Sequence, residues 1–226
     1  VGSEMCIRDR SGSGKSTVAN LIPRFWDVEQ GEILIGNVNV KDIATEQLMD
    51  LVSFVFQDTF LFYDTLYENI AVGSSKATRD TVIAAARAAQ CHEFIEKLPN
   101  GYETRIGDKG VFLSSGEAQR VCVARAILKN APILVLDEAT AFADPENEYK
   151  MQQALKSLIK DKTVIIIAHR LSSIVSSDRI IVLKDGKAVQ CGRHEELSSQ
   201  EGVYKKMWNA YTSAFRWQLN VKQEKE

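Results

Sequence analysis

The sequence predicts an α/β fold in which a mainly parallel sheet surrounds a phosphate-binding loop. Residues 11–17 read Ser-Gly-Ser-Gly-Lys-Ser-Thr and run directly into an apolar helical stretch. Residues 133–136 and 163–168 are almost entirely apolar, as is typical of strands buried on both faces. Each of these strands is followed by a charged or polar residue. In α/β proteins the carboxyl ends of the strands face the ligand crevice, so the fold and the site are predicted together.

Bulk composition limits the class of protein. The chain has 226 residues, of which 45% are hydrophobic and 26% charged, as in a soluble globular domain. A formal net charge of −2 gives no electrostatic reason to expect nucleic acid as a partner. The four cysteines are scattered without a C-x-x-C pair, which predicts reduced thiols. No apolar run approaches the roughly 20 residues that a membrane span requires, so we expect this piece of chain to be soluble.

The phosphate-binding loop carries the first chemical prediction. Glycines allow successive backbone N–H groups to point at phosphate oxygens, and the following helix adds its partial positive charge. Lys15 is then placed to reach the β- and γ-phosphates, and the Ser16 hydroxyl is placed to bind Mg²⁺. The residues predicted to hold the nucleotide are Ser11, Gly12, Ser13, Gly14, Lys15, Ser16 and Thr17. The motif departs from the usual pattern at Asp9, where its first glycine would fall.

Residues 1–10 do not have the pattern of the strand that should precede such a loop. Glu4, Arg8, Asp9 and Arg10 interrupt any buried apolar run. We therefore expect no strand here, and interpret the segment as foreign sequence joined to a truncated chain at about Ser11. The alternative is a natural variant loop.

The segments between the loop and residue 111 alternate between strand and helix patterns. Residues 31–40 predict a hairpin with Gly36-Asn37 as its turn, and residues 45–51 a short helix. The strand 53–56 ends at Gln57, which points to the ligand crevice, although such a residue by itself is more often part of a surface turn. Residues 79–90 predict an alanine-rich helix, and residues 103–111 a loop punctuated by glycine.

A long helix is predicted from about Ser114. Ser114 and Ser115 are good N-cap residues, and small residues before a helix form a second potential anion site. Taken alone, the stretch 113–120 is more simply a capped helix.

The strand 133–136 is followed by Asp137 and Glu138, two carboxylates whose burial needs a compensating partner. Beside a phosphate loop, Asp137 is suited to the Mg²⁺ shell and Glu138 to polarising the attacking water. His169 follows the strand 163–168 and is placed to donate to a γ-phosphate oxygen, although a histidine there is more often simply packed. Residues 145–160 predict a helix, residues 179–190 a hairpin, residues 193–215 helix, and the remainder a frayed polar tail.

These motifs, in this order and spacing, closely resemble the nucleotide-binding domain of ATP-binding cassette (ABC) transporters over about residues 11–211. Residues 11–17 match most of the Walker A loop, Gln57 the Q-loop, and residues 113–120 the signature motif. Asp137 and Glu138 match the Walker B aspartate and the catalytic glutamate, His169 the switch histidine, and Asp144 the D-loop aspartate. In the signature, Ser115 replaces the first of two glycines.

The resemblance implies a P-loop NTPase (RecA-like) core with a mainly parallel sheet, an antiparallel β subdomain and an inserted helical subdomain carrying the signature. We expect the domain to span residues 11–217, the helical subdomain about residues 58–130, and a polar tail residues 218–226. Residues 65–70, 104–110 and 192–197 look like the exporter branch. There, the loop 104–110 contacts transmembrane domains that commonly precede this domain on the same chain.

Family members dimerise head to tail, so a second nucleotide-binding domain is the implied partner. Each ATP is then held by Walker A of one domain and by the signature of the other, here Ser114, Ser115, Gly116 and Glu117. Lys15, Gln57, Glu138 and His169 are the implied catalytic residues, with Ser16, Gln57 and Asp137 around Mg²⁺. The resemblance implies an ATPase at the cytoplasmic face of a membrane that powers export. The alternative is an ATP-binding, non-hydrolytic half of a heterodimeric transporter; a soluble cassette ATPase acting on DNA or ribosomes fits the exporter-like loops poorly.

Overall fold

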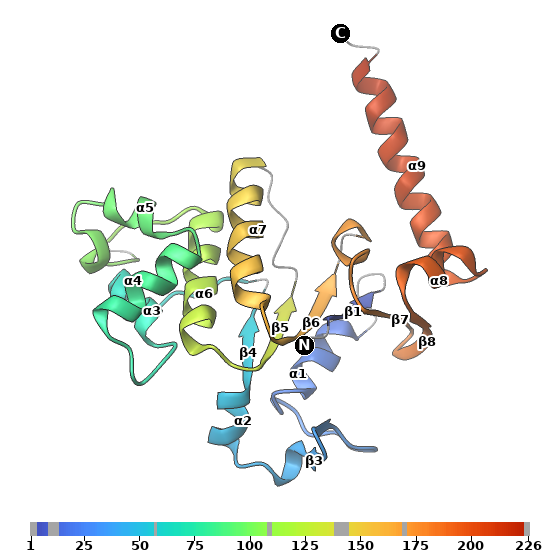
Figure 1. Ribbon diagram of the computed structural model, residues 1–226, viewed down its shortest axis with the longest axis horizontal. Helices are drawn as coiled ribbons and strands as arrows, with labels where there is room; N and C mark the ends of the chain where they lie inside the picture. The colour runs from blue at the N-terminus through green and yellow to red at the C-terminus, as the bar shows by residue number, and fades with distance from the viewer. Residues whose placement is uncertain are drawn as a thin grey trace.

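The computed structural model describes residues 4–8, 14–56, 58–107, 110–137, 145–168 and 171–223. Its central sheet has six strands in the order β4-β5-β6-β1-β7-β8 (Figure 1). The strands are β1 (Glu4–Arg8), β4 (Val52–Val55), β5 (Ile133–Asp137), β6 (Thr163–Ala168), β7 (Arg179–Lys184) and β8 (Lys187–Gly192). All neighbouring pairs are parallel except the β7–β8 hairpin, which is antiparallel. The predicted mainly parallel sheet is confirmed.

Strand β1 corrects one expectation. Residues 4–8 form a strand that pairs in parallel with β6 on one side and with β7 on the other. Charged residues lower the local preference for a strand, but every residue still offers a main-chain N–H and C=O for pairing. Two neighbouring strands satisfy these groups, so tertiary context overrides the sequence pattern. The foreign origin of residues 1–10 stays a prediction.

Helices cover both faces of the sheet because successive strand residues point to opposite sides. On one face, Leu134, Leu136 and Val164 belong to the same core as Met151 of α7 (Pro145–Ile159) and Val121 of α6 (Ser115–Lys129). On the other face, the core contains Val135, Ile165 and Ile167 with Ala19 of α1 (Lys15–Leu21) and Leu48 of α2 (Thr45–Leu51). The apolar runs in the sequence are therefore strands buried on both faces.

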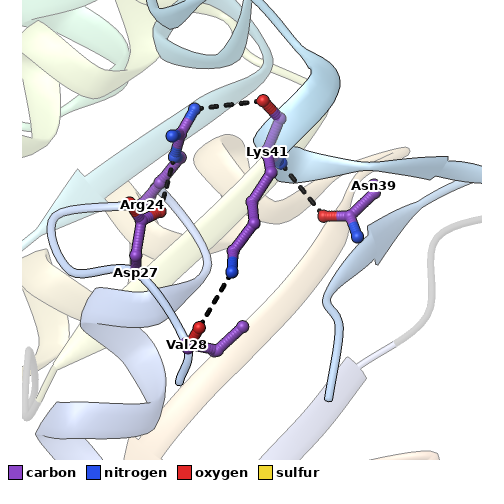
Figure 2. Close-up of polar contacts among 5 residues, drawn as sticks. All are labelled: Arg24, Asp27, Val28, Asn39 and Lys41. Carbon is purple, nitrogen blue, oxygen red and sulfur yellow. Dashed lines mark hydrogen bonds and ion pairs between the residues drawn. The ribbon is translucent and has the colours of Figure 1, made fainter. Parts of the chain in front are cut away.

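A small antiparallel hairpin packs beside α1. It consists of β2 (Leu34–Ile35) and β3 (Val38–Asn39), followed by a 3₁₀ turn, η1 (Val40–Asp42). Figure 2 shows how it is anchored: Lys41 Nζ donates to the Val28 carbonyl at 2.9 Å, and Arg24 Nη1 donates to the Lys41 carbonyl at 3.3 Å. Arg24 is itself held by Asp27 Oδ1 at 2.7 Å. These contacts fix the hairpin to the turn that follows α1.

A group of helices lies beside the β4 edge of the sheet, on the left of Figure 1. It comprises α3 (Leu66–Ala71), α4 (Arg79–Ala88), α5 (His92–Glu96), the 3₁₀ turn η2 (Gly101–Glu103) and α6. Helix α6 packs against α3, α4 and α7, which joins this group to the sheet. All of these helices fall within the span expected for the helical subdomain.

The chain ends in a helical segment that differs from the sequence expectation. After β8 it forms α8 (His194–Ser199) and then α9 (Val203–Gln223), rather than one helix over residues 193–215. A 3₁₀ turn, η3 (Leu171–Ile174), joins Leu197 and Tyr204 in a third buried cluster. The helix α9 continues to Gln223 and projects away from the sheet (Figure 1), so most of the expected polar tail is helical.

Candidate functional site

The described part of the phosphate-binding loop begins at Gly14, the N-cap of α1. Its φ of 91° is left-handed, a conformation that glycine adopts without strain. The next residue, Lys15, is only 4% exposed, although it opens a helix whose other first-turn residues, Ser16 and Thr17, are exposed. The buried Lys15 side chain, two exposed hydroxyls and the first N–H groups of the helix thus lie at one end of α1, a suitable arrangement for phosphate.

Sheet register relates Asp137, the Walker B candidate, to β1, the strand that precedes this loop in the sequence. Asp137 pairs with Ile167 of β6, and Ile167 pairs with Ile7 of β1, so the three residues lie in one row across the sheet. Strand β1 ends at Arg8, and the phosphate-binding loop begins three residues later in the sequence, at Ser11. Asp137 is 9% exposed. A carboxylate buried at this edge is costly unless a cation or a set of donors faces it, and its hard oxygen atoms suit Mg²⁺.

Several predicted residues lie outside the described residues. These are Ser11, Gly12, Ser13, Gln57, Glu138, Asp144 and His169. The strands that precede three of them are described: β4, β5 and β6 are adjacent and parallel. Strand β4 ends two residues before Gln57, β5 ends one residue before Glu138, and β6 ends one residue before His169. The three strands therefore end at the same edge of the sheet, where Asp137 lies.

The predicted second anion site is the N-terminus of α6, and its capping is confirmed. Ser114 Oγ accepts a hydrogen bond from the Glu117 amide at 3.3 Å and donates to Glu117 Oε2 at 2.8 Å. Glu117 Oε2 also accepts from the Ser114 amide at 2.9 Å, which completes a capping box. Ser114 and Ser115 are exposed, so the first turn of α6 is presented to the outside.

The sequence reasoning missed the residue that supports this turn from behind. Asn147, in the first turn of α7, accepts a hydrogen bond from Arg120 Nη1 at 2.7 Å. A Cβ added to Gly116 would lie 3.3 Å from Asn147 Cγ, so the glycine lets α7 approach closely. The only signal in the sequence is the i, i+4 spacing of Gly116 and Arg120, which places both on one face of a helix.

The loop 104–111 folds back onto the segment before α3. Thr65 and Arg105 form an antiparallel bridge, Leu66 N donates to the Thr104 carbonyl at 3.0 Å, and Ile106 N donates to the Asp64 carbonyl at 3.0 Å. Gly107 has a φ of 107°, and an added Cβ would collide with the Tyr63 ring. Two of the three stretches that look exporter-like in the sequence, residues 65–70 and 104–110, are therefore in direct contact.

These two stretches border an exposed aromatic surface. Phe60, Phe62, Tyr63 and Phe112 are all exposed, although aromatic rings are usually buried. Beside them is a hollow of about 660 Å³ whose lining includes Phe62, Tyr67 and Val72. The backbone beneath is well anchored: the buried Asn69 side chain accepts from the Phe62 amide at 2.8 Å and donates to the Phe62 carbonyl at 3.0 Å. Rigid backbone and exposed rings are typical of a binding surface.

The family model described as ABC transporter matches residues 2–141, more than half of the chain. The chain belongs to the ABC transporter family. This chain is 49% identical over 208 residues to an ATP-dependent lipid A-core flippase of Methylobacillus flagellatus, and 46% identical over 207 residues to a Bacillus subtilis protein whose name describes multidrug export. Both alignments cover 92% of this chain and 36% of the relative.

A solved structure of a bacterial Atm1-family ABC exporter with ATP bound is also similar, with a TM-score of 0.85 and 41% identity. The match covers 92% of this chain and 36% of that one. The ABC ATPase fold is thereby confirmed, and the relatives are exporters. The chain spans about a third of the length of the relatives it matches, and among the described residues no helix is both long and apolar enough to cross a membrane.

Proposed function

We propose that this ABC domain binds and hydrolyses ATP, and that it powers the export of a substrate across a membrane through ATP-driven dimerisation. The observation that carries the proposal is the sheet register. It aligns Asp137 with β1, the strand that precedes the phosphate-binding loop in the sequence. Nucleotide binding is general in the family, and ATPase activity is its usual chemistry. The family match and the exporter relatives support this assignment.

Within one site, the α1 N-terminus and Lys15 are suited to hold the ATP phosphates. Mg²⁺ would neutralise phosphate charge during phosphoryl transfer, held by Ser16, Asp137 and Gln57. The exposed hydroxyl of Ser16 and the buried carboxylate of Asp137 are oxygen donors of the kind that this ion prefers. Glu138 is assigned to orienting or deprotonating the attacking water, and His169 to donating a hydrogen bond to the γ-phosphate.

The dimer proposal rests on the N-terminus of α6. Its first turn begins at the exposed residues Ser114 and Ser115, and Glu117 completes the capping box with Ser114. A second nucleotide-binding domain would bring its ATP γ-phosphate against this turn, where helix N–H groups stabilise negative charge. We assign Gly116 to close approach and Asp144 to the D-loop contact with the partner.

The aromatic surface beside the loop 104–111 is the face we assign to the transmembrane domains. Exposed rings and an adjacent hollow provide apolar area for a protein partner without refolding of the backbone. We propose that these membrane domains belong to the same transporter, which would place the domain at the cytoplasmic face of a membrane. The two relatives are named for different cargoes, lipid A-core and multiple drugs, so the cargo of this transporter is not assigned.

ATP hydrolysis and ATP-dependent dimerisation test the proposal directly. We expect Glu138→Gln to lower the hydrolysis rate at least about 100-fold, the usual size of a lost general base, and to accumulate an ATP-bound dimer in size-exclusion chromatography. Lys15→Ala should abolish both hydrolysis and the dimer. Thr17→Ser, which keeps a hydroxyl, serves as the matched control.

A non-hydrolytic half-site is the second candidate, because Ser115 occupies the first position of α6, where the signature usually has glycine. In that case the chain binds ATP, and Glu138→Gln does not change a slow background rate. Ser115→Gly would then separate the two candidates: restored hydrolysis identifies the hydroxymethyl group as the cause.

A further inference from the structure

A second pocket lies in the helical part of the domain, behind the N-terminal turn of α6 rather than at the N-terminus of α1. It has a volume of about 380 Å³, within the range of small-molecule sites. Its walls come from the end of α4, from α5, and from the facing turns of α6 and α7. The lining includes Arg87, Glu93, Phe94, Lys97, Arg120 and Lys150. Among the described residues, none of those predicted to hold ATP or Mg²⁺ is in its lining, although Arg120 belongs to the signature stretch 113–120.

The base of this pocket contains a buried cation. Arg120 is 4% exposed, and its guanidinium lies 5.5 Å from the centre of the Phe94 ring. Nη1 donates to Asn147, but Nε has no hydrogen-bond partner among the described residues. Burial lowers the pKa of Arg120, although nearby Glu117 raises it in part. Nε is a buried atom, so an acceptor in the pocket would have to approach the rest of the guanidinium, whose desolvated charge is costly without one.

The remaining charges around the pocket do not supply that acceptor. Arg87 and Lys97 are exposed and have no ion-pair partner in the described part of the chain. Lys150 is paired with Glu146 at 2.6 Å, and His92 lies 3.4 Å from Glu96. Glu93 is the one carboxylate among the described lining residues. Four cationic groups therefore line the pocket in a chain whose net charge is −2. Such a local excess attracts an anion.

We propose that this pocket binds a small phosphate-bearing anion, with Arg120 donating at its base and with Arg87 and Lys97 at its mouth. A guanidinium presents a planar fork of donors that matches phosphate oxygens, and lysine adds a point charge. The Phe94 ring offers an apolar face to an organic part of the ligand.

Histidine NMR can observe this pocket directly, because the chain has three histidines and His92 lines the pocket. His194 lies on α8 and serves as the internal reference. The 226-residue protein would be titrated with inorganic pyrophosphate at constant ionic strength, with sodium chloride as the blank. Single His→Gln variants assign the imidazole signals. We expect a saturable shift of the His92 signal and none of His194.

The lining cations are then tested with charge-neutral variants. Arg87→Gln and Lys97→Gln should each weaken the binding seen at His92 by about threefold to fivefold, as expected for the loss of an exposed ionic contact. Arg79→Gln removes a cation from the same helix α4 but outside the pocket, and should leave binding unchanged. An immobile His92 signal would overturn the proposal. So would a shift that survives both pocket variants, or one that Arg79→Gln weakens equally.

Discussion

Replacing Ser114 with alanine separates the structural role of the α6 cap from its proposed role in ATP binding. The substitution removes one hydrogen bond from the Glu117 amide and one to the Glu117 carboxylate. Loss of a serine N-cap typically costs about 1 kcal/mol, within a range of roughly 0.5–2. The cap is exposed, so water replaces part of the lost interaction, and we expect the free energy of unfolding to fall by about 1 kcal/mol. For a domain of this size, that corresponds to a fall in Tm of about 2–4 °C.

Urea unfolding followed by circular dichroism measures this loss, and two variants act as controls. Ser114→Thr retains a capping hydroxyl and should lose less than about half as much stability. Ser115→Ala removes an exposed hydroxyl for which the structure records no capping bond, and its free energy of unfolding should stay within about 0.5 kcal/mol of the original. Equal destabilisation by Ser115→Ala, or none by Ser114→Ala, would refute the capping-box interpretation. ATP-dependent dimerisation of the same variants reports on the separate functional role.

Three further predictions concern packing, anchoring and ionisation. The Met151 side chain is 1% exposed between α7 and the sheet, so Met151→Ala should lower the free energy of unfolding by about 2–5 kcal/mol. Met151→Leu nearly keeps the volume and should cost less than about 1.5 kcal/mol. Equal losses in the two variants would contradict this explanation. Arg125 donates hydrogen bonds to the Asn69 carbonyl at 2.9 Å and to the Asn69 side chain at 3.1 Å, and Arg125→Ala removes both. Limited proteolysis of this variant should show faster cleavage before α3. Arg125→Lys should increase the cleavage rate by less. Burial raises the pKa of the Cys91 thiol from 9.0 to about 12, so at pH 8 a thiol reagent should label exposed Cys191 and reach Cys91 only on unfolding. Since unfolded Cys91 ionises near pH 9 and the folded thiol resists until about 12, its contribution to stability is complete below pH 9 and falls as pH rises above it.

The capped helix and the buried strands were predictable because their causes are local. Ser114 and Glu117 stand three residues apart in the sequence, and that spacing is sufficient to predict the capping box. The apolar run 133–136 likewise predicts a strand buried on both faces, as β5 is. The one-residue difference at β4, which covers Val52–Val55 rather than residues 53–56, is within the usual uncertainty of an element boundary.

The sequence by itself determined the order of the motifs and the apolar strands that precede the polar candidates, and it predicts phosphate binding by residues 11–17, because each of these depends on residues close together in the chain. Only the tertiary structure decided that residues 4–8 join the sheet, since their partners lie 160 residues away in β6, at Glu4 and Val164, and 174 residues away in β7, at Met5 and Arg179. It also decided that Asn147 supports Gly116 and that four cations surround one pocket. No local pattern encodes these contacts, because they arise where separate helices meet.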